Sequence, residues 1–222
     1  MSLQDWTARE RPGQWPLAGN RVVLEPLDWD VHADGLYKAV AAPDIADLWD
    51  YMPIGPFKDQ SQFEKTLNYI RSELSWQVLV IRKVNGGRIL GMASYMRIRE
   101  AHGSAEVGCV SFGRALRRTP EATEAMYLMA HHVFEELGYR RYEWKCNNDN
   151  AASRRAATRF GFQYEGVFRN DMVSKGKNRD TAWFAMTDED WPVLKSAFEA
   201  WLDPKNFDAS GAQKQKLEAF RS

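Results

Sequence analysis

The residues best suited to chemistry lie in one stretch, residues 117–162, where a basic turn precedes a helix. Arg117 and Arg118 supply two positive charges directly before Thr119 and Pro120, which together make a favourable helix start. The first turn of a helix carries free N–H groups and the positive end of the helix dipole, so it attracts anions such as phosphate. A short strand, an Asn-rich loop and a second short helix follow. This order predicts a site that holds a long phosphate-bearing molecule between two strands.

The spacing of apolar residues predicts the elements that position this stretch. We expect helices over residues 31–41, 60–74, 120–137, 151–160 and 188–202, and strands over residues 21–27, 76–83, 88–96, 106–112, 142–146, 162–168 and 181–186. Asp28 or Asp30 caps the first helix, Asp59 caps the second, and the turn at residues 85–87 (Asn-Gly-Gly) closes a hairpin.

Hairpins combined with one β-α-β crossover predict a single α/β (α+β) domain over residues 21–202. The breakers Pro12, Gly13, Pro16 and Gly19 predict an irregular N-terminal arm over residues 1–20. Residues 203–222 form a polar C-terminal tail, which we expect to be weakly ordered unless Phe207 and Phe220 anchor it.

Composition excludes several classes of protein. Thirty Lys and Arg residues balance thirty Asp and Glu residues in the 222-residue chain, so no overall charge favours nucleic acid or an anionic membrane. No apolar run is long enough to span a bilayer, and the N-terminus lacks the apolar core of a secretory signal. Cys109 and Cys146 are the only cysteines and have no neighbours of the kind that bind a metal. We therefore expect a reduced, cytoplasmic protein without a disulfide or a metal.

The chain resembles the GNAT superfamily of acyl-CoA-dependent N-acyltransferases. The resemblance covers residues 21–191 and rests on the opening RVVLEPL, the strand EVG, the helix and strand ATEAMYLMAHHVFEELGYRRYEWKC, and the run NDNAASRRAATRFGFQYEGVFR. Its most specific part is Asn150 followed by Ser153, the run RFGF at residues 159–162 and the pair Glu165-Gly166. Within the superfamily the chain looks most like the Rim-type branch, which acetylates the N-termini of ribosomal proteins.

The resemblance implies a GNAT-like fold, in which helices flank a central mixed, twisted sheet with two splayed parallel strands. It also implies acetyl-CoA as the acyl-donating cosubstrate, with its pantetheine arm between the strands over residues 106–112 and 142–146. Backbone N–H and C=O groups left unpaired by the splay then bind the amides of that arm. The residues implied to bind the cosubstrate are Val107, Cys109, Val110, Arg117, Arg118, Thr119, Ala122, Thr123, Asn147, Asn150 and Ser153.

The phosphate-binding turn departs from the pattern of the family at Pro120. Relatives usually have Gly at this position, and proline has no N–H to donate to a phosphate. Glu121 adds a negative charge in the first turn of the helix, whereas Arg114, Arg117 and Arg118 add positive charge nearby. Two interpretations therefore stay open: acetyl transfer to an amine, or a non-catalytic CoA-binding or interaction module on the same fold.

Direct attack of an amine on a thioester needs a base for the amine and a proton donor for the thiolate. The resemblance implies that Glu106 is the base or holds a relay water, because many relatives have a carboxylate there; a solvated or ion-paired Glu is the alternative. Ser153 is the implied hydroxyl near the sulfur, with helix capping as its alternative. Many relatives place a Tyr acid where this chain has Ala157, and we expect Tyr164 to lie in the core.

No motif identifies the acceptor amine, which we expect on a protein N-terminus or a small molecule. In this architecture the loop over residues 49–57 shapes the acceptor side, and the implied substrate-binding residues are Trp49, Tyr51, Met52 and Phe57. The hairpin tip at residues 175–180 is expected to be solvated or to flank the acceptor. The N-terminal arm and the last helix make a homodimer one of the expected states.

Overall fold

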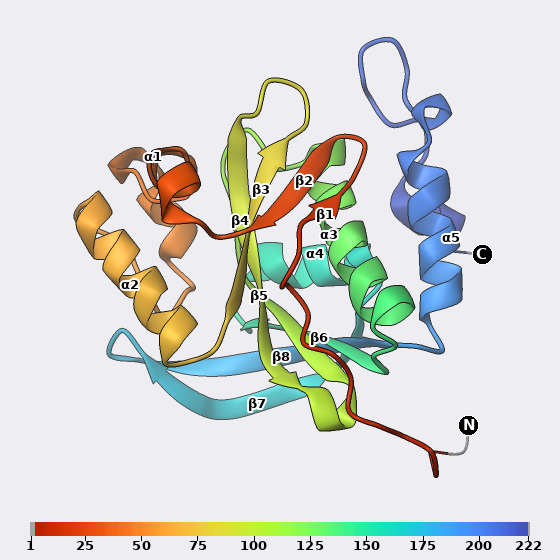
Figure 1. Ribbon diagram of the computed structural model, residues 1–222, viewed down its shortest axis with the longest axis horizontal. Helices are drawn as coiled ribbons and strands as arrows, with labels where there is room; N and C mark the ends of the chain where they lie inside the picture. Colours follow the sequence, from red (N-terminus) through yellow and green to blue (C-terminus); the bar gives the residue numbers. More distant parts are fainter. Residues whose placement is uncertain (1–2, 222) are drawn as a thin grey trace.

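The computed structural model describes residues 3–221, which build an open eight-stranded sheet with helices on both faces (Figure 1). The strand order is β1-β2-β3-β4-β5-β6-β8-β7, and β5 with β6 is the parallel pair among antiparallel neighbours. The strands are β1 (Leu17–Ala18), β2 (Val22–Pro26), β3 (Gln77–Lys83), β4 (Ile89–Arg99), β5 (Ser104–Phe112), β6 (Arg141–Asn147), β7 (Gln163–Ser174) and β8 (Lys177–Thr187). The predicted mixed sheet with one parallel crossover is confirmed.

Five α-helices are present in the described residues, and short 3₁₀ turns lie between and after them. The helices are α1 (Trp29–Val40), α2 (Gln60–Ser72), α3 (Pro120–His131), α4 (Ala151–Phe160) and α5 (Trp191–Leu202). The 3₁₀ turns are η1 (Pro43–Trp49), η2 (Glu100–His102), η4 (Pro204–Asn206) and η5 (Leu217–Phe220), and a π turn, η3 (His132–Glu136), follows α3.

Side-chain caps decide where four of these helices begin. Asp28 accepts a hydrogen bond from the Asp30 N–H at the start of α1, so Asp28 and not Asp30 is the cap. Asp59 caps α2, and Thr119 caps α3 directly before Pro120, as predicted. Asn150 caps α4 through its side-chain oxygen. Each cap of this kind stabilises a helix by about 1 kcal/mol.

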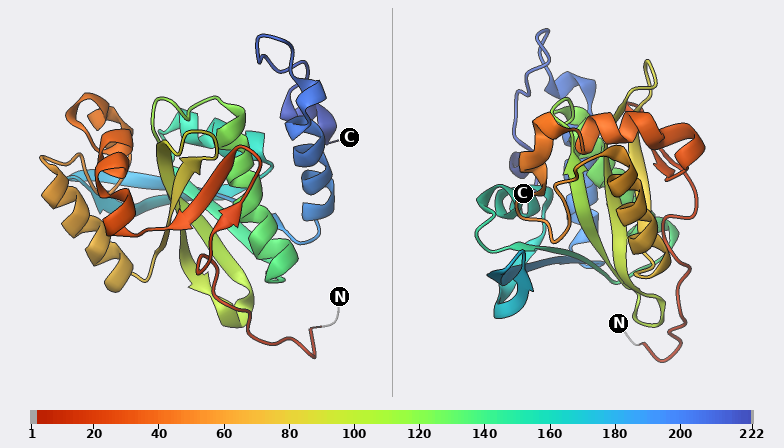
Figure 2. Two further views of the ribbon diagram at one scale, coloured as in Figure 1. Left: turned by 45° about the horizontal axis from the view of Figure 1, so that its top comes forward. Right: turned by 90° about the vertical axis from the view of Figure 1, so that its left-hand side faces the viewer.

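The helices cover the two faces of the sheet in two separate apolar layers. α1 and α2 pack on one face, around Trp49, Phe63 and Leu67, which have no exposed surface or almost none. α3, α4 and α5 pack on the other face, around Tyr142 and Trp144 of β6 (Figure 2). β5 contributes to both layers, through Cys109 in the first and Val107 in the second, so its position is held from both faces.

The long central helix differs from its prediction near its end. Residues 120–137 were expected to form one α-helix, but α3 ends at His131 and a wider π turn follows. The Leu137 N–H donates to the His132 carbonyl over 3.1 Å, a contact that spans five residues instead of four. Gly138 then takes a positive φ of 66° and ends the element.

The β7–β8 hairpin is longer and more exposed than predicted. The turn is confined to Lys175 and Gly176, and both strands extend to it. Tyr164, expected in the core, is 55% exposed, so that prediction was wrong. The reason is the position of β7 at the outer edge of the sheet, where it has a neighbour on one side alone.

Both ends of the described chain are tied to the domain. In the N-terminal arm, the Trp6 indole donates to the Ala101 carbonyl over 2.8 Å, and β1 pairs with β2. At the C-terminal end, Leu217 is fully buried, and Phe207 and Phe220 pack against the core, so the anchored alternative for this tail is the observed one. Within residues 3–221, no helix combines the length and apolar character needed to cross a membrane.

Candidate functional site

The parallel strands β5 and β6 separate halfway along their length. They pair from Ser104 and Arg141 as far as Val107 and Trp144, and no pairing follows. Beyond that point β5 continues to pair with β4 and β6 continues to pair with β8. The facing edges of β5 and β6 therefore carry backbone groups without a ladder partner, as the predicted splay requires.

A β-bulge at Cys109 accompanies this separation. The register between β4 and β5 shifts here, and Cys109 has a φ of 48°, which is uncommon for a residue other than glycine. Its side chain is buried in the layer beneath α1 and α2, and burial raises the pKa of the thiol to about 12. The thiol is therefore protonated at neutral pH, and Cys109 contributes to the site through the shape of its backbone. Val110, the next residue, packs into the opposite layer.

The three arginines of the basic turn before α3 point in different directions. Arg114 forms an ion pair with Asp44, 3.2 Å away, and thus turns toward η1. Arg117 donates to the Phe112 carbonyl over 3.0 Å and lies 3.8 Å from the Asp47 carboxylate. Arg118 has a positive φ of 62° and no ion pair among the described residues. Arg118 is thus a free cation at the start of the helix.

The backbone of this turn offers few donors to an anion. The Thr119 N–H donates to the Leu116 carbonyl over 3.3 Å, and the Ala122 N–H donates to the Thr119 hydroxyl over 3.3 Å. Pro120 has no N–H. Anion binding at this turn therefore depends on arginine side chains more than on backbone amides.

Glu121, which seemed to oppose an anion, points away from the site. Its carboxylate lies 3.0 Å from the Lys83 ammonium of β3. Burial by itself raises the pKa of Glu121, but the hydrogen bonds from Lys83 and from backbone N–H leave the pKa below its ordinary value. Glu121 is therefore a charged group paired with Lys83, and its negative charge is neutralised on the side of the helix that faces β3.

A pocket of about 680 Å³ lies beside the start of α3, and we call it the α3–α4 pocket. Its walls are the turn over residues 117–120, the first turn of α3, one side of α4 and the chain after α5. Phe112, the last residue of β5, also lines it, so the pocket lies at the end of the splay. Arg117, Arg118 and Arg159 line it, and none of its described lining residues is Asp or Glu. It is a positively lined space of the size typical for a small-molecule site.

Glu106 lies on the face of β5 opposite α3 and is 3% exposed. Its carboxylate is 2.9 Å from the Lys145 ammonium on β6 and 3.7 Å from the Arg97 guanidinium on β4. Burial raises the pKa of Glu106, and the two cations offset only part of that rise. Glu143, its register partner on β6, is equally buried but is held by Arg99 and Arg141 at 2.8 and 2.7 Å.

Ser153 lies in the first turn of α4, next to the end of β6. Its N–H donates to the Asn150 side chain over 3.0 Å, so the capping role belongs to Asn150. Its hydroxyl accepts a hydrogen bond from the Trp144 indole over 3.0 Å. Ala157, one turn further along α4, is fully buried and has no group that donates a proton.

Two further residues predicted to bind the cosubstrate are Thr123, which lines the α3–α4 pocket, and Asn147, which ends β6. Thr123 on α3 accepts a hydrogen bond from the Arg159 guanidinium over 3.1 Å, which links α3 to α4 across the α3–α4 pocket. Asn147, the last residue of β6, accepts from the Asp149 N–H over 2.9 Å and orders the loop before α4. The structure therefore brings the predicted cosubstrate residues together around the splay and the pocket.

The four residues predicted to bind substrate do not form one surface. Trp49 is fully buried, donates to the Val40 carbonyl and packs edge-on against Phe57, with ring centroids 4.8 Å apart. Trp49 and Phe57 thus shape their loop from within. Tyr51 is 44% exposed and Met52 is partly buried, so these two side chains are accessible to a substrate.

The tip of the β7–β8 hairpin reaches this same loop. The Lys175 ammonium donates to the Trp49 carbonyl over 2.7 Å. The tip of the hairpin is therefore in contact with the predicted acceptor loop, in line with the expected alternative that it flanks the acceptor.

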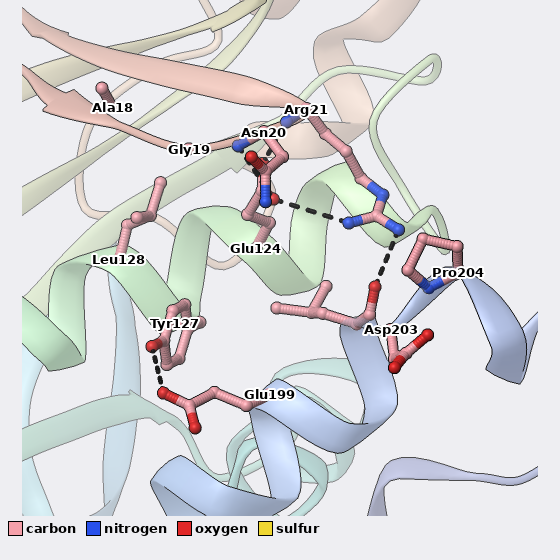
Figure 3. A pocket seen from close by; sticks show the side chains of 11 residues that line it. Ala18, Gly19, Asn20, Arg21, Glu124, Tyr127, Leu128, Glu199, Asp203 and Pro204 are labelled. Atoms are coloured by element: carbon pink, nitrogen blue, oxygen red, sulfur yellow. Dashed lines mark hydrogen bonds and ion pairs between the residues drawn. The ribbon is translucent and has the colours of Figure 1, made fainter.

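A second cavity, of about 470 Å³, lies on the other side of α3 (Figure 3). The Glu124 carboxylate accepts hydrogen bonds from the backbone N–H groups of Asn20, Arg21 and Val22. The Tyr127 hydroxyl donates to Glu199 over 2.9 Å. These hydrogen bonds link α3 to the start of β2 and to α5. Because the polar groups around this cavity are paired with one another, we assign the cavity a structural role and do not take it as the candidate site.

Sequence reasoning missed three contributors to the site. Lys145, the partner of Glu106, could have been found from the alternation of β6, which puts Glu143 and Lys145 on the face opposite Trp144. Arg159 was noted as part of a motif but not as a lining residue. The loop after α5 gave no signal, because a polar segment such as residues 208–216 reads as solvated chain.

Comparisons with known proteins agree with this geometry. The model of the acetyltransferase (GNAT) domain family matches residues 21–163. The crystal structure of a GCN5-related N-acetyltransferase from Brucella melitensis is 43% identical, covers 99% of this chain and 99% of its own, and has a TM-score of 0.94. The uncharacterized N-acetyltransferase p20 of Bacillus licheniformis is 26% identical over 171 residues, which are 75% of this chain and 92% of the relative.

The predicted Rim-type resemblance also has a structural counterpart. An acetyl transferase from Salmonella typhimurium that modifies the N-terminal serine of the 50S ribosomal subunit protein L7/L12 is 19% identical. It covers 78% of this chain and 98% of its own, with a TM-score of 0.67. At this identity the likeness shows a shared fold and does not identify the acceptor amine of this chain.

Proposed function

Because this chain belongs to the acetyltransferase (GNAT) family of N-acetyltransferases, we propose that it transfers the acetyl group of acetyl-CoA to a primary amine. The amine attacks the thioester directly and belongs to a protein N-terminus or a small molecule. One observation carries the proposal: the splay of β5 and β6 ends at a pocket lined by arginines and by the start of α3.

The residues present fit this cosubstrate. The facing edges of the strands beyond Val107 and Trp144 offer N–H and C=O groups to the amides of the pantetheine arm. Arg117 and Arg118 offer charge-assisted hydrogen bonds to the pyrophosphate in place of the N–H that Pro120 lacks. When bound, acetyl-CoA supplies the acyl group in the activated form of a thioester.

Glu106 is the proposed base. An acceptor amine is mostly protonated at neutral pH, so it must lose a proton before it attacks. Burial raises the pKa of Glu106 and brings its basicity closer to that task. The Lys145 ammonium at 2.9 Å opposes this rise, because it stabilises the charged, proton-accepting form of the carboxylate. The proton passes to Glu106 directly or through a water molecule.

Ser153 is the proposed proton donor to the departing sulfur. The indole N–H of Trp144 can only donate, so the Ser153 oxygen accepts from it and retains its own proton. That proton can be donated to a thiolate beside the start of α4, in place of the hydrogen bond that links the Ser153 hydroxyl to the Cys146 thiol. Ala157 cannot replace it, since its side chain is a methyl group.

An amine panel tests the proposal. Purified protein is incubated with acetyl-CoA and a set of peptides with free N-termini and small primary amines, and the release of free thiol is measured. We expect turnover with at least one amine, and calorimetry should detect CoA binding. If neither acetyl-CoA nor free CoA binds, the proposal is wrong.

Pro120 and Ala157 favour a second candidate, a non-catalytic CoA-binding or interaction module, because both depart from the usual pattern of the family. Glu121 does not support it, because its charge is neutralised by Lys83. This candidate predicts CoA binding without turnover across the whole panel. Turnover that is lost in Glu106→Gln would rule it out.

The acceptor is proposed to bind between the exposed side chain of Tyr51 and the β7–β8 hairpin, which Lys175 ties to the same loop. We also propose a cytoplasmic location. Cys109 and Cys146 are both free, buried thiols, a state that suits a reducing compartment.

A further inference from the structure

The segment after α5 lies outside the residues that the family model matches, yet it forms a wall of the α3–α4 pocket. Phe207, Gly211, Ala212 and Gln213 all line the pocket. We infer that the loop over residues 207–213 binds the nucleotide end of CoA, which is its pyrophosphate and 3′-phosphoadenosine. This inference rests on the proposed function, because it assigns one end of the same cosubstrate.

The loop has a defined shape of its own. Phe207 and Gln213 form an isolated β-bridge across its base. The Asp208 carboxylate accepts hydrogen bonds from the N–H groups of Ser210 and Ala212 over 2.9 and 3.0 Å. The Trp201 indole donates to the Gln213 side chain over 2.9 Å. The wall is therefore preformed, which lowers the entropy lost when a ligand binds.

Residues before and after the loop attach it to α5 and to α4. The Asn206 amide donates to the Trp201 carbonyl at the end of α5 over 3.1 Å and to the Gln215 carbonyl over 3.2 Å. Arg221 donates to the carbonyls of Thr158 and Arg159 at the end of α4. The segment thus spans from α5 to α4 and holds the loop at the edge of the pocket.

The chemistry of the enclosed space fits a phosphorylated nucleoside. Arg118 forms no ion pair with any residue of the described part of the chain, and Arg159 is held over the Trp201 ring at 5.0 Å, with Glu218 as an electrostatic neighbour but no carboxylate in ion-pair contact, so two cations border the pocket. Phe160, Trp201 and Phe207 supply an apolar wall suited to a purine. Phosphates near the arginines and a base against the apolar wall would occupy both kinds of surface. The pantetheine arm, by contrast, lies in the splay and does not need the loop.

A pair of alanines in this loop provides the test. Ala212 lines the pocket, whereas Ala209 lies in the same loop and does not, and both are exposed. Ala212→Asp places a negative charge where it repels the phosphates or pairs with an arginine that they need. Ala209→Asp makes the identical change of charge outside the pocket. Neither substitution removes a buried contact, and equal melting temperatures would verify that both variants fold.

Binding of CoA is measured by calorimetry, and turnover is measured with acetyl-CoA and with acetyl-pantetheine, which has no phosphate or adenosine. We expect Ala212→Asp to raise the Kd for CoA about fivefold or more, while Ala209→Asp and Ala212→Lys leave it unweakened. The KM for acetyl-pantetheine should be the same in all variants. If wild-type protein binds CoA and Ala212→Asp binds it equally well, the inference alone is overturned. If wild-type protein binds no CoA, the proposed function falls with it.

Discussion

Replacing Glu106 by Gln removes the proposed base and keeps its shape. Glu106 is 3% exposed, so a change of volume at this position would disturb the sheet, whereas Gln fits the same space. The amide cannot accept the proton of the acceptor amine. A positioned general base contributes about 10²- to 10⁴-fold to a rate. At about 1.36 kcal/mol for each factor of ten, the expected rise of the barrier is about 2.7 to 5.4 kcal/mol.

Glu143→Gln is the matched control. Glu143 is the register partner of Glu106, is equally buried and lies on the adjacent strand, but Arg99 and Arg141 hold its carboxylate. Its loss should therefore lower the free energy of unfolding, since Arg99 loses its carboxylate partner and Arg141 keeps only Glu165. It should reduce kcat/KM much less than Glu106→Gln does.

The pH dependence supplies an independent readout of the same role. Because the pKa of Glu106 is raised above its ordinary value, kcat/KM should fall as the pH drops through that raised pKa. Lys145→Met removes a cation that lowers the pKa, so the acid limb of the profile should move to higher pH. The raised pKa also means that charging Glu106 costs stability as the pH rises through it.

The assay is the initial rate of thiol release as a function of amine concentration, from pH 5 to pH 9, which gives kcat/KM for the three variants and the wild type. A Glu106→Gln protein that turns over within about threefold of wild type would refute the reasoning. An acid limb that stays in place in Lys145→Met would show that another group is the base.

The remaining predictions concern the turn before α3 and the start of α4. Pro120→Gly adds an N–H at the anion site and should tighten CoA binding about two- to tenfold, the effect of one added hydrogen bond. The same change should lower the unfolding free energy by about 1 kcal/mol, because the unfolded chain gains freedom; calorimetry and denaturant melts measure both effects. Ser153→Ala should lower kcat about 10²-fold with an unchanged Kd for CoA. It should also destabilise the fold by about 1 kcal/mol, since Trp144 loses its acceptor; an unchanged kcat would assign the proton donation to water.

Local rules made much of the fold predictable from the sequence. Thr119 followed by Pro120 identified the start of α3, and Asp59 identified the start of α2, because capping depends on neighbouring residues alone. The Asn-Gly-Gly turn likewise identified the β3–β4 hairpin. The splay of β5 and β6 was expected from the resemblance, not from any local pattern.

What escaped prediction depends on partners far along the chain. Glu121 seemed to oppose phosphate binding until Lys83, on another strand, was found to neutralise it. Tyr164 looked like a core residue, because the sequence does not tell which strand lies at the edge of the sheet. In the polar tail the sequence offered Phe207 and Phe220 as possible anchors, but nothing marked Leu217, which is fully buried, as a residue that reaches the core.

The irregular turn at residues 117–122 combines two requirements, a stable helix start and a binding site for phosphate. Thr119 and Pro120 make a stable helix start. The Ala122 N–H donates to the Thr119 hydroxyl and Pro120 has no N–H, so neither position offers a backbone donor to a phosphate. In the proposed site the positive charge comes instead from side chains, Arg118 on the turn and Arg159 on α4, which both line the pocket. Side chains bind an anion well when their positions are restricted, and Arg159 is held by Thr123 and by the Trp201 ring. A site of this kind gains from an outer wall that confines the ligand against its arginines, which is the place that the loop over residues 207–213 occupies.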